Sequence, residues 1–198
     1  GGTGAMGVHL VQKLADKNYD VYVTSRSRSG QQENITYIVG DAKENDFLQK
    51  LLNERWDCIV DFMVYSTSQF QERYEFFLNA TEHYFFISSS RVYAESNTPL
   101  TENSPRLLEI SQDELYLATD EYALTKARQE NLLFESVYKN WTIIRPYITY
   151  DKERLQLGVL EKEEWLYRVI NGRTIVTARD FQTKQTTLTS GKDVAHAI

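Results

Sequence analysis

Tyr122 and Lys126 stand four residues apart within "DEYALTKARQENLLFESVYKN", a segment with a helical pattern. Residues four apart share one face of a helix, so the lysine ammonium can lie near the tyrosine hydroxyl. A nearby positive charge lowers the pKa of a tyrosine from about 10 toward neutrality, and the phenol can then exchange a proton with a substrate hydroxyl or carbonyl. The spacing therefore indicates general acid–base chemistry. The alternative is a solvated tyrosine and lysine one helical turn apart.

A glycine-rich stretch, "GGTGAMG", precedes a predicted helix and is suited to binding a phosphate. Gly1, Gly4 and Gly7 let the backbone approach a pyrophosphate closely, and a helix N-terminus supplies unpaired N–H groups for it. Such a loop follows a strand, so we expect a first strand that the printed sequence does not contain. The ending "GKDVAHAI" likewise stops inside a helical pattern. An ordinary glycine-rich turn is the alternative.

Short β-rich runs alternate with longer helical patterns along most of the chain. The predicted strands are residues 19–24, 35–39, 57–64, 84–90 and 141–147. The predicted helices are residues 8–14, 45–56, 66–83 and 120–140. Ser66 and Gln69 form a possible capping box at the start of one of them. The alternation predicts parallel crossovers and a doubly wound α/β sheet, and it ends near Pro146.

Composition limits the class of protein. The 198 residues are 41% hydrophobic and 25% charged, enough for a sizeable core, and the net charge of −6 argues against a nucleic-acid partner. Cys58 lies alone in an apolar run, so we expect a buried, reduced thiol. His9, His83 and His196 are too far apart in sequence to indicate a metal site. No apolar run approaches the ~18 residues of a membrane helix, and no signal peptide precedes the glycines, so we expect a cytoplasmic protein without a membrane partner.

Several motifs together resemble the extended short-chain dehydrogenase/reductases, the family of NAD-dependent epimerases and dehydratases. "GGTGAMG" is similar to the family's G-x-x-G-x-x-G loop, "VGDAKE" to its adenine-side Gly-Asp, "FISSSRVYA" to its serine strand and "YALTK" to its Tyr-x-x-x-Lys pair. "DCIVDFMVYS", "IIRPY" and "GKDVAHAI" resemble further landmarks, so the resemblance covers most of the chain. It implies a Rossmann-like cofactor-binding domain over residues 1–146. Residues 147–198 would begin a small substrate-binding region, with 190–198 returning to the first domain.

The resemblance also implies roles for single residues. Tyr122 would carry the proton, Lys126 would also hold the nicotinamide ribose, and Ser89, selected by the S-x-x-V-Y pattern, would bind the reacting oxygen, with Ser90 in reserve. An ordinary strand-to-loop transition is the alternative for the three serines. The implied cofactor contacts are Gly1, Thr3, Gly4, Ala5, Met6, Gly7, Arg26, Asp41, Ala42, Phe62, Met63, Tyr122, Lys126 and Tyr147. The implied substrate contacts are Ser90, Arg91 and Arg154.

The end of the second predicted strand bears on the choice of cofactor. NAD-binding sites have an acid there for the ribose 2′-hydroxyl, whereas NADP-binding sites have an arginine for the 2′-phosphate. Ser25 occupies the acid position, with Arg26 next and Arg28 close by. We therefore expect NADP, with NAD as the alternative. Simple solvation of the two arginines is the other interpretation.

Departures from the family pattern bear on the reaction. The dehydratases carry an Asp-Glu pair where this chain has Ser90 and Arg91, so we expect epimerisation or carbonyl reduction of a sugar-like, possibly nucleotide-linked substrate rather than dehydration. Ile148 replaces an asparagine and Asp151 and Lys152 replace a Gly-Pro, which puts the usual nucleotide-sugar contacts in doubt. The chain also resembles the chloroplast stem-loop RNA-binding subgroup. The alternative function is therefore a non-catalytic dinucleotide-sensing or RNA-binding module.

The resemblance further implies a homodimer. In similar enzymes the helices corresponding to residues 66–81 and 120–139 lie side by side and pair with their copies in an isologous four-helix interface. The first segment carries Phe70, Tyr74 and Phe77 at helical spacing, and we expect this stripe to be exposed. A core-facing stripe is the alternative.

Overall fold

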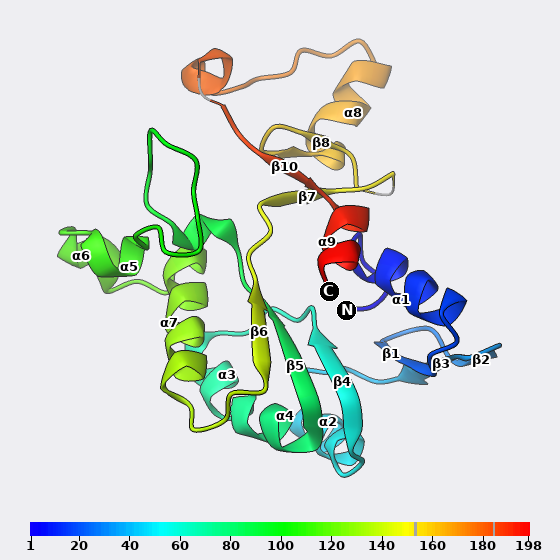
Figure 1. Cartoon of the computed structure of the whole chain (residues 1–198). Coiled ribbons are helices and arrows are strands. Elements are labelled where there is room, and N and C mark those ends of the chain that lie inside the picture. The colour runs from blue at the N-terminus through cyan, green and yellow to red at the C-terminus, as the bar shows by residue number, and fades with distance from the viewer. Residues whose placement is uncertain (153, 184) are drawn as a thin grey trace. The chain divides into compact units, whose positions relative to one another are not determined.

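The computed structural model describes residues 1–152, 154–183 and 185–198 (Figure 1). Contacts divide the chain into two compact units. Unit 1 consists of Gly1, Thr24–Ser27 and Val39–Pro146, and unit 2 consists of Gly2–Val23, Arg28–Ile38 and Tyr147–Ile198. The division into domains 1–146 and 147–198 stays a prediction. No helix in the described ranges is long and apolar enough to cross a membrane.

A parallel sheet of three strands forms the centre of unit 1. Its strands, in order, are β4 (Trp56–Asp61), β5 (Thr81–Ile87) and β6 (Trp141–Ile144). The helices of unit 1 are α2 (Asn45–Leu52), α3 (Thr67–Gln71), α4 (Tyr74–Ala80), α5 (Leu107–Ile110), α6 (Glu114–Leu117) and α7 (Tyr122–Glu135). Parallel strands need long crossovers, and helices supply them here between β4 and β5 and between β5 and β6 (Figure 1). The predicted α/β class is confirmed.

The helix predicted over residues 66–83 is interrupted. Its start is as expected, because the Ser66 hydroxyl accepts from the Gln69 amide at 3.2 Å and the Gln69 side chain accepts from the Ser66 amide at 3.1 Å. This confirms the capping box. The helix α3 then ends at Gln71, and α4 begins at Tyr74. Arg73 lies at the break with its guanidinium buried against the Tyr65 ring.

The aromatic stripe of this segment belongs to the core, so the prediction that it is exposed is wrong. Phe70 and Phe77 are buried, with ring centroids 4.8 Å from Phe86 and 5.2 Å from Tyr84. The cluster around them consists of Leu48, Tyr65, Phe70, Phe77, Leu78, Tyr84, Phe86 and Leu133. The helix face that bears the stripe packs onto β5, which removes it from any dimer interface. The contact between α3 and α7 agrees with the prediction that they are neighbours.

Cys58 is exposed, so the prediction of a buried thiol is also wrong. Within the described residues, β4 is an outer strand of its sheet and pairs only with β5. Side chains of an outer strand therefore lack the cover that a neighbouring strand provides. An apolar run in sequence predicts a strand but does not reveal its place in the sheet.

Unit 2 is made of segments from the beginning and from the end of the printed sequence. The helix α1 (Gly7–Asp16) packs Val11 against Val21 and Val23, which lie on β1 (Val21–Ser25). In its sheet, β1 neighbours β3 (Ile35–Val39), which pairs with β2 (Gly30–Gln32), a strand that the sequence pattern did not predict. The later elements are β7 (Ile148–Tyr150), β8 (Gln156–Leu157), β9 (Leu160–Glu161), α8 (Lys162–Ile170), β10 (Leu188–Ser190) and α9 (Gly191–Ala197).

The predicted C-terminal helix is confirmed as α9, and it packs against α1 and the glycine loop. A Cβ atom on Gly191 would lie 2.1 Å from the carbonyl oxygen of Ala5, so only glycine permits this approach. Lys13 Nζ and His196 Nδ1 are 2.7 Å apart, joining the two helices by a hydrogen bond. The loop is thus supported by residues from the far end of the sequence.

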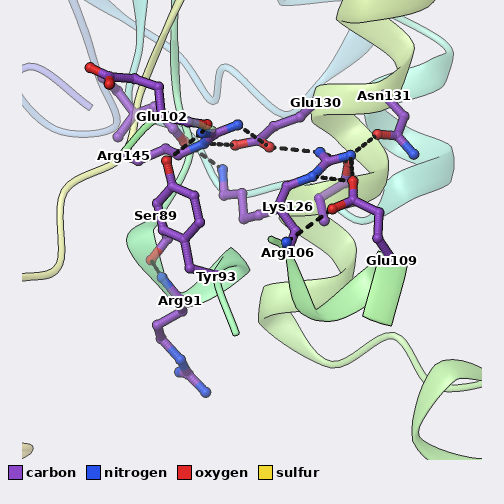
Figure 2. Close-up of polar contacts among 12 residues, drawn as sticks. Ser89, Arg91, Tyr93, Glu102, Arg106, Glu109, Lys126, Glu130, Asn131 and Arg145 are labelled. Atoms are coloured by element: carbon purple, nitrogen blue, oxygen red, sulfur yellow. Dashed lines mark hydrogen bonds and ion pairs between the residues drawn. The ribbon is translucent and has the colours of Figure 1, made fainter. Parts of the chain in front are cut away.

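A network of charged side chains, most of them buried, holds α7 in unit 1 (Figure 2). The carboxylate of Glu130, on α7, accepts from Arg145 Nε at 2.8 Å and from Arg106 Nη1 at 2.9 Å. Arg106 also binds Glu109, and Arg145 donates to the Tyr93 hydroxyl at 2.5 Å. Figure 2 shows Glu130 between the two guanidinium groups. The network therefore ties the loop before α5 and the residues after β6 to the helix that carries Tyr122 and Lys126.

Phe70→Ala should destabilise the protein because it opens a cavity among aromatic rings. We expect the free energy of unfolding, measured by urea denaturation, to fall by about 3–5 kcal/mol. The matched control is Phe76→Ala on the following helix, since Phe76 is 53% exposed. That variant should cost about 1 kcal/mol or less. Equal costs would contradict the burial of the stripe.

Glu130→Gln should destabilise the protein for a different reason. It removes the carboxylate that binds Arg145 and one of the two carboxylates that bind Arg106, and breaking a buried ion pair in this way costs about 3–5 kcal/mol. Glu109→Gln is the control, because Glu109 also binds Arg106 but its side chain is 47% exposed. We expect it to cost about 1 kcal/mol or less. If the network does not stabilise the protein, both variants will lower the free energy of unfolding by the same small amount.

Candidate functional site

The three serines after β5 differ in their hydrogen bonds. The Ser89 hydroxyl oxygen accepts from the Arg91 amide at 3.2 Å and so begins a short 3-10 helix, Ser90–Val92. Because this oxygen is an acceptor there, its own O–H is still available to donate. The hydroxyl groups of Ser88 and Ser90 are buried, with no hydrogen-bond partner among the described residues. Ser89 is the serine whose orientation is set by the backbone.

Lys126 is buried on α7 and points to the carboxyl end of β5. Its ammonium donates to the carbonyl of Ile87 at 2.8 Å and lies 4.6 Å from the centroid of the Phe86 ring. Ile87 comes two residues before Ser89, so this bond brings α7 to the strand end that leads into the serines. Burial lowers the pKa of Lys126 to about 8, although the charges of Asp61 and Glu130 oppose the shift. The ammonium is therefore mostly protonated at neutral pH.

Tyr122 is the first residue of α7 and lies beside Arg91. Glu121 caps the helix by accepting from the Ala123 amide at 2.7 Å, and it pairs with Arg91 at 2.8 Å. The Arg91 guanidinium stands over the Tyr122 ring, 5.5 Å from its centroid. Tyr116 also donates to Glu121. The structure thus gathers Tyr122 and Arg91, while α7 also contacts the 3-10 helix that follows Ser89.

The carboxyl end of β4 holds a carboxylate that the sequence analysis missed. Asp61 is buried and accepts from the Met63 amide and from the Tyr84 hydroxyl, both at 2.9 Å. The next residue, Phe62, lies so close to Gly1 that a Cβ atom there would be 2.3 Å from the Phe62 Cβ. A charged residue inside the apolar run "CIVDFMV" was the available signal for Asp61.

The residues expected near the adenosine lie at the carboxyl ends of β1 and β3. The Gly40 amide donates to the Ser25 carbonyl at 2.9 Å, which joins these ends. Asp41 accepts from the Lys43 amide at 2.9 Å in a local turn, directly before Ala42. Arg26 is exposed. The structure therefore brings Arg26 and Asp41 to neighbouring strand ends.

The glycine loop in unit 2 is suited to binding an anion. Met6, the N-cap of α1, makes no side-chain capping bond, and the first turn contains no acidic residue. No side-chain cap therefore occupies the first N–H groups of the helix, although the Val8 amide donates to the Gly4 carbonyl at 3.0 Å. A Cβ atom on Gly2 would lie 2.7 Å from the Val23 side chain, so the loop packs closely on β1. Thr3, Gly4 and Ala5 precede the helix start in the same loop.

The other predicted contacts in unit 2 have protein partners. The Tyr147 amide donates to the Thr189 hydroxyl at 3.1 Å. Arg154 donates to Glu161 at 3.2 Å and to the Thr149 hydroxyl at 2.8 Å. Arg154 would therefore have to exchange partners to bind a phosphate. In the described ranges, no three His, Cys, Asp or Glu side chains are grouped to hold a metal.

Comparison with solved structures shows the fold. UDP-N-acetylglucosamine 4-epimerase from Methanobrevibacter ruminantium M1 matches with a TM-score of 0.72 and 20% identity, over 99% of this chain and 69% of that one. An epimerase from Methanothermobacter thermautotrophicus matches with a TM-score of 0.71 and 18% identity, over 98% and 63%. UDP-glucuronic acid 4-epimerase from Bacillus cereus, solved with NAD, matches with a TM-score of 0.63 and 17% identity, over 88% and 62%. This chain thus spans about two thirds of each of these proteins.

No curated protein sequence matches the chain. The model of one protein family, described as NAD(P)H-binding, matches residues 1–171. The match includes the glycine loop, the strand ends with Arg26 and Asp41, and the segment from Ser89 to Lys126. Because it extends over most of the sequence, the predicted cofactor class is confirmed, and the chain belongs to the NAD(P)H-binding family.

Proposed function

We propose that the chain is the cofactor-binding part of an NAD(P)-dependent epimerase that acts on a nucleotide-linked sugar. The observation that carries the proposal is the bond from the buried Lys126 ammonium to the Ile87 carbonyl, because it brings α7 and the end of β5 together. Tyr122 and Ser89 are the acid–base candidates on these two elements. The epimerases with the same fold support this choice of reaction.

The side chains suit proton transfer at a carbinol carbon. Tyr122 would take the proton of a substrate hydroxyl and later return it, and the positive charge of Lys126 would favour the ionised phenol. Ser89 would donate its O–H to the reacting oxygen. When bound, the dinucleotide would supply reversible hydride transfer at that carbon. The lysine charge is present below a pH of about 8 and is lost above it, so the reaction should slow on the alkaline side.

Each part of the cofactor would have its own set of contact residues. The glycine loop would bind the pyrophosphate, which fits the uncapped start of α1. Asp41 and Ala42 would meet the adenine, and Arg26 would meet a 2′-phosphate. Phe62, Met63, Tyr147 and Lys126 would supply further contacts.

Epimerisation is favoured over dehydration because the site lacks the second acid–base pair. Ser90 and Arg91 occupy those positions, and Arg91 is bound to Glu121. Ser90, Arg91 and Arg154 would face the substrate. A homodimer and a cytoplasmic location also stay predictions, and the interface would have to use exposed residues such as Phe76 instead of the buried stripe.

Tyr122→Phe should lower kcat by about 10²-fold, because it removes the exchangeable proton while preserving the ring. The affinity for the dinucleotide should hardly change. The substrate would first be found by screening nucleotide sugars and small carbonyl compounds. Tyr19→Phe is the matched control, since Tyr19 is exposed. Native turnover in Tyr122→Phe would favour the non-catalytic binding module.

Two further variants separate the roles of the other residues. Ser89→Ala should lower kcat without changing cofactor affinity, whereas Lys126→Ala should lower both, because the lysine supplies a charge and a ribose contact. Ser88→Ala is the control for the serine, since its hydroxyl has no hydrogen-bond partner among the described residues. An equal loss for Ser88→Ala and Ser89→Ala would count against the assigned role of Ser89.

Calorimetry should show tighter binding of NADP than of NAD. Arg26→Ala should weaken the binding of NADP by about tenfold or more and leave the binding of NAD unchanged, because this arginine would contact only the 2′-phosphate. Arg55→Ala, a change of another exposed arginine, serves as control. A clear preference of the unmodified chain for NAD, the cofactor named with two of the solved relatives, would overturn the argument from Arg26.

A further inference from the structure

A carboxylate and the α7 lysine both lie near Phe86 inside unit 1, at the carboxyl ends of β4 and β5. Asp61 is the last residue of β4 and pairs in register with Phe86 of β5. Lys126 reaches the same place from α7, with its ammonium 4.6 Å from the Phe86 ring centroid and bound to the carbonyl of Ile87. The two charges therefore occupy one small region at the end of the sheet.

Two donors stabilise the ionised form of Asp61. One carboxylate oxygen accepts from the Met63 amide and the other from the Tyr84 hydroxyl, each at 2.9 Å. Burial raises the pKa of Asp61 above its ordinary value, and these two bonds and the charge of Lys126 offset only part of that rise. The pKa values of Tyr84 and of nearby Tyr65 are raised by burial and by Asp61, so both phenols stay neutral.

Glu130 is the other carboxylate near Lys126, but its charge is already balanced. It binds two arginines, Arg106 and Arg145 (Figure 2). Within the described part of the chain, Asp61 makes no ion pair with an arginine. Of the two carboxylates that act on Lys126, Asp61 is thus the one that no arginine balances among the described residues.

We propose that Asp61 is a positioning residue that keeps the buried Lys126 ammonium protonated and so sets the pH range in which Tyr122 exchanges its proton. A lone ammonium in this setting would lose its proton because burial disfavours charge. Asp61 opposes that loss without touching the substrate. The link to Tyr122 rests on the proposed function, whereas the link to Lys126 does not.

The first test measures the pKa of Lys126 by NMR of lysine labelled at Cε and Nζ. In Asp61→Asn this pKa should fall from about 8 by about one unit or more. Asp57→Asn, the same change at an exposed position of β4, is the control and should leave it unchanged. An unaltered Lys126 pKa in Asp61→Asn would overturn the proposal.

A reciprocal test does not depend on the folding of Asp61→Asn. Coupling between two sites is mutual, so replacing Lys126 must raise the pKa of Asp61 by as much as replacing Asp61 lowers that of Lys126. Lys126→Met removes the charge and keeps a long apolar side chain, and carboxyl-labelled aspartate reports the Asp61 titration. A rise in the Asp61 pKa supports the proposal. No rise would overturn it.

Turnover separates this proposal from the proposed function. In Asp61→Asn the alkaline limb of the kcat–pH profile should move to lower pH by the shift seen for Lys126, which a purely structural role would not produce. If no sugar is turned over, the epimerase assignment fails while the two NMR results still decide the role of Asp61. If Tyr122→Phe abolishes turnover but the NMR coupling is absent, only the proposal for Asp61 fails.

Discussion

A lysine ammonium held away from water is the constraint on which unit 1 depends. Lys126 is almost fully buried, and removal of a charge from water is costly unless partners replace the solvent. The Ile87 carbonyl supplies the direct bond, and Asp61 and Glu130 supply negative charge. Since these groups come from β4, β5 and α7, one side chain determines how three elements approach one another.

The face of α7 that carries Lys126 also carries a residue that stabilises unit 1. Glu130 lies one turn beyond Lys126 and binds Arg106 and Arg145, which come from segments on either side of α7 in the sequence. Movement of α7 would therefore disturb the ion pairs and the lysine together. The position of Tyr122, at the first turn of that helix, is set by interactions that lie further along it. Rigid support of this kind is what proton transfer at a defined distance requires.

Local patterns predicted the parts of the fold that depend on nearby residues. The strands near Val21, Phe85 and Trp141 and the cap at Ser66 follow from alternation and from a four-residue motif, whereas Thr81, predicted to be helical, begins β5. The burial of side chains was harder to predict. An aromatic stripe such as that at Phe70 has the same sequence pattern whether it packs on a sheet or faces solvent. The exposure of Cys58 likewise depends on the order of strands, which no local pattern contains. The spacing of Tyr122 and Lys126 could be read from the sequence. The surroundings of Asp61 could not, because they come from Tyr84 and from a helix that is distant in sequence.

The contact of Gly191 with the Ala5 carbonyl has a consequence for biosynthesis. The glycine loop leaves the ribosome before the residues that pack upon it, because Gly191 follows Ala5 by 186 residues (191 − 5). Contacts between such distant residues carry a large entropy of loop closure and slow folding. Residues 2–7 therefore stay without this packing until Gly191 has been made, and a nascent chain can complete the glycine loop's contacts only after that point.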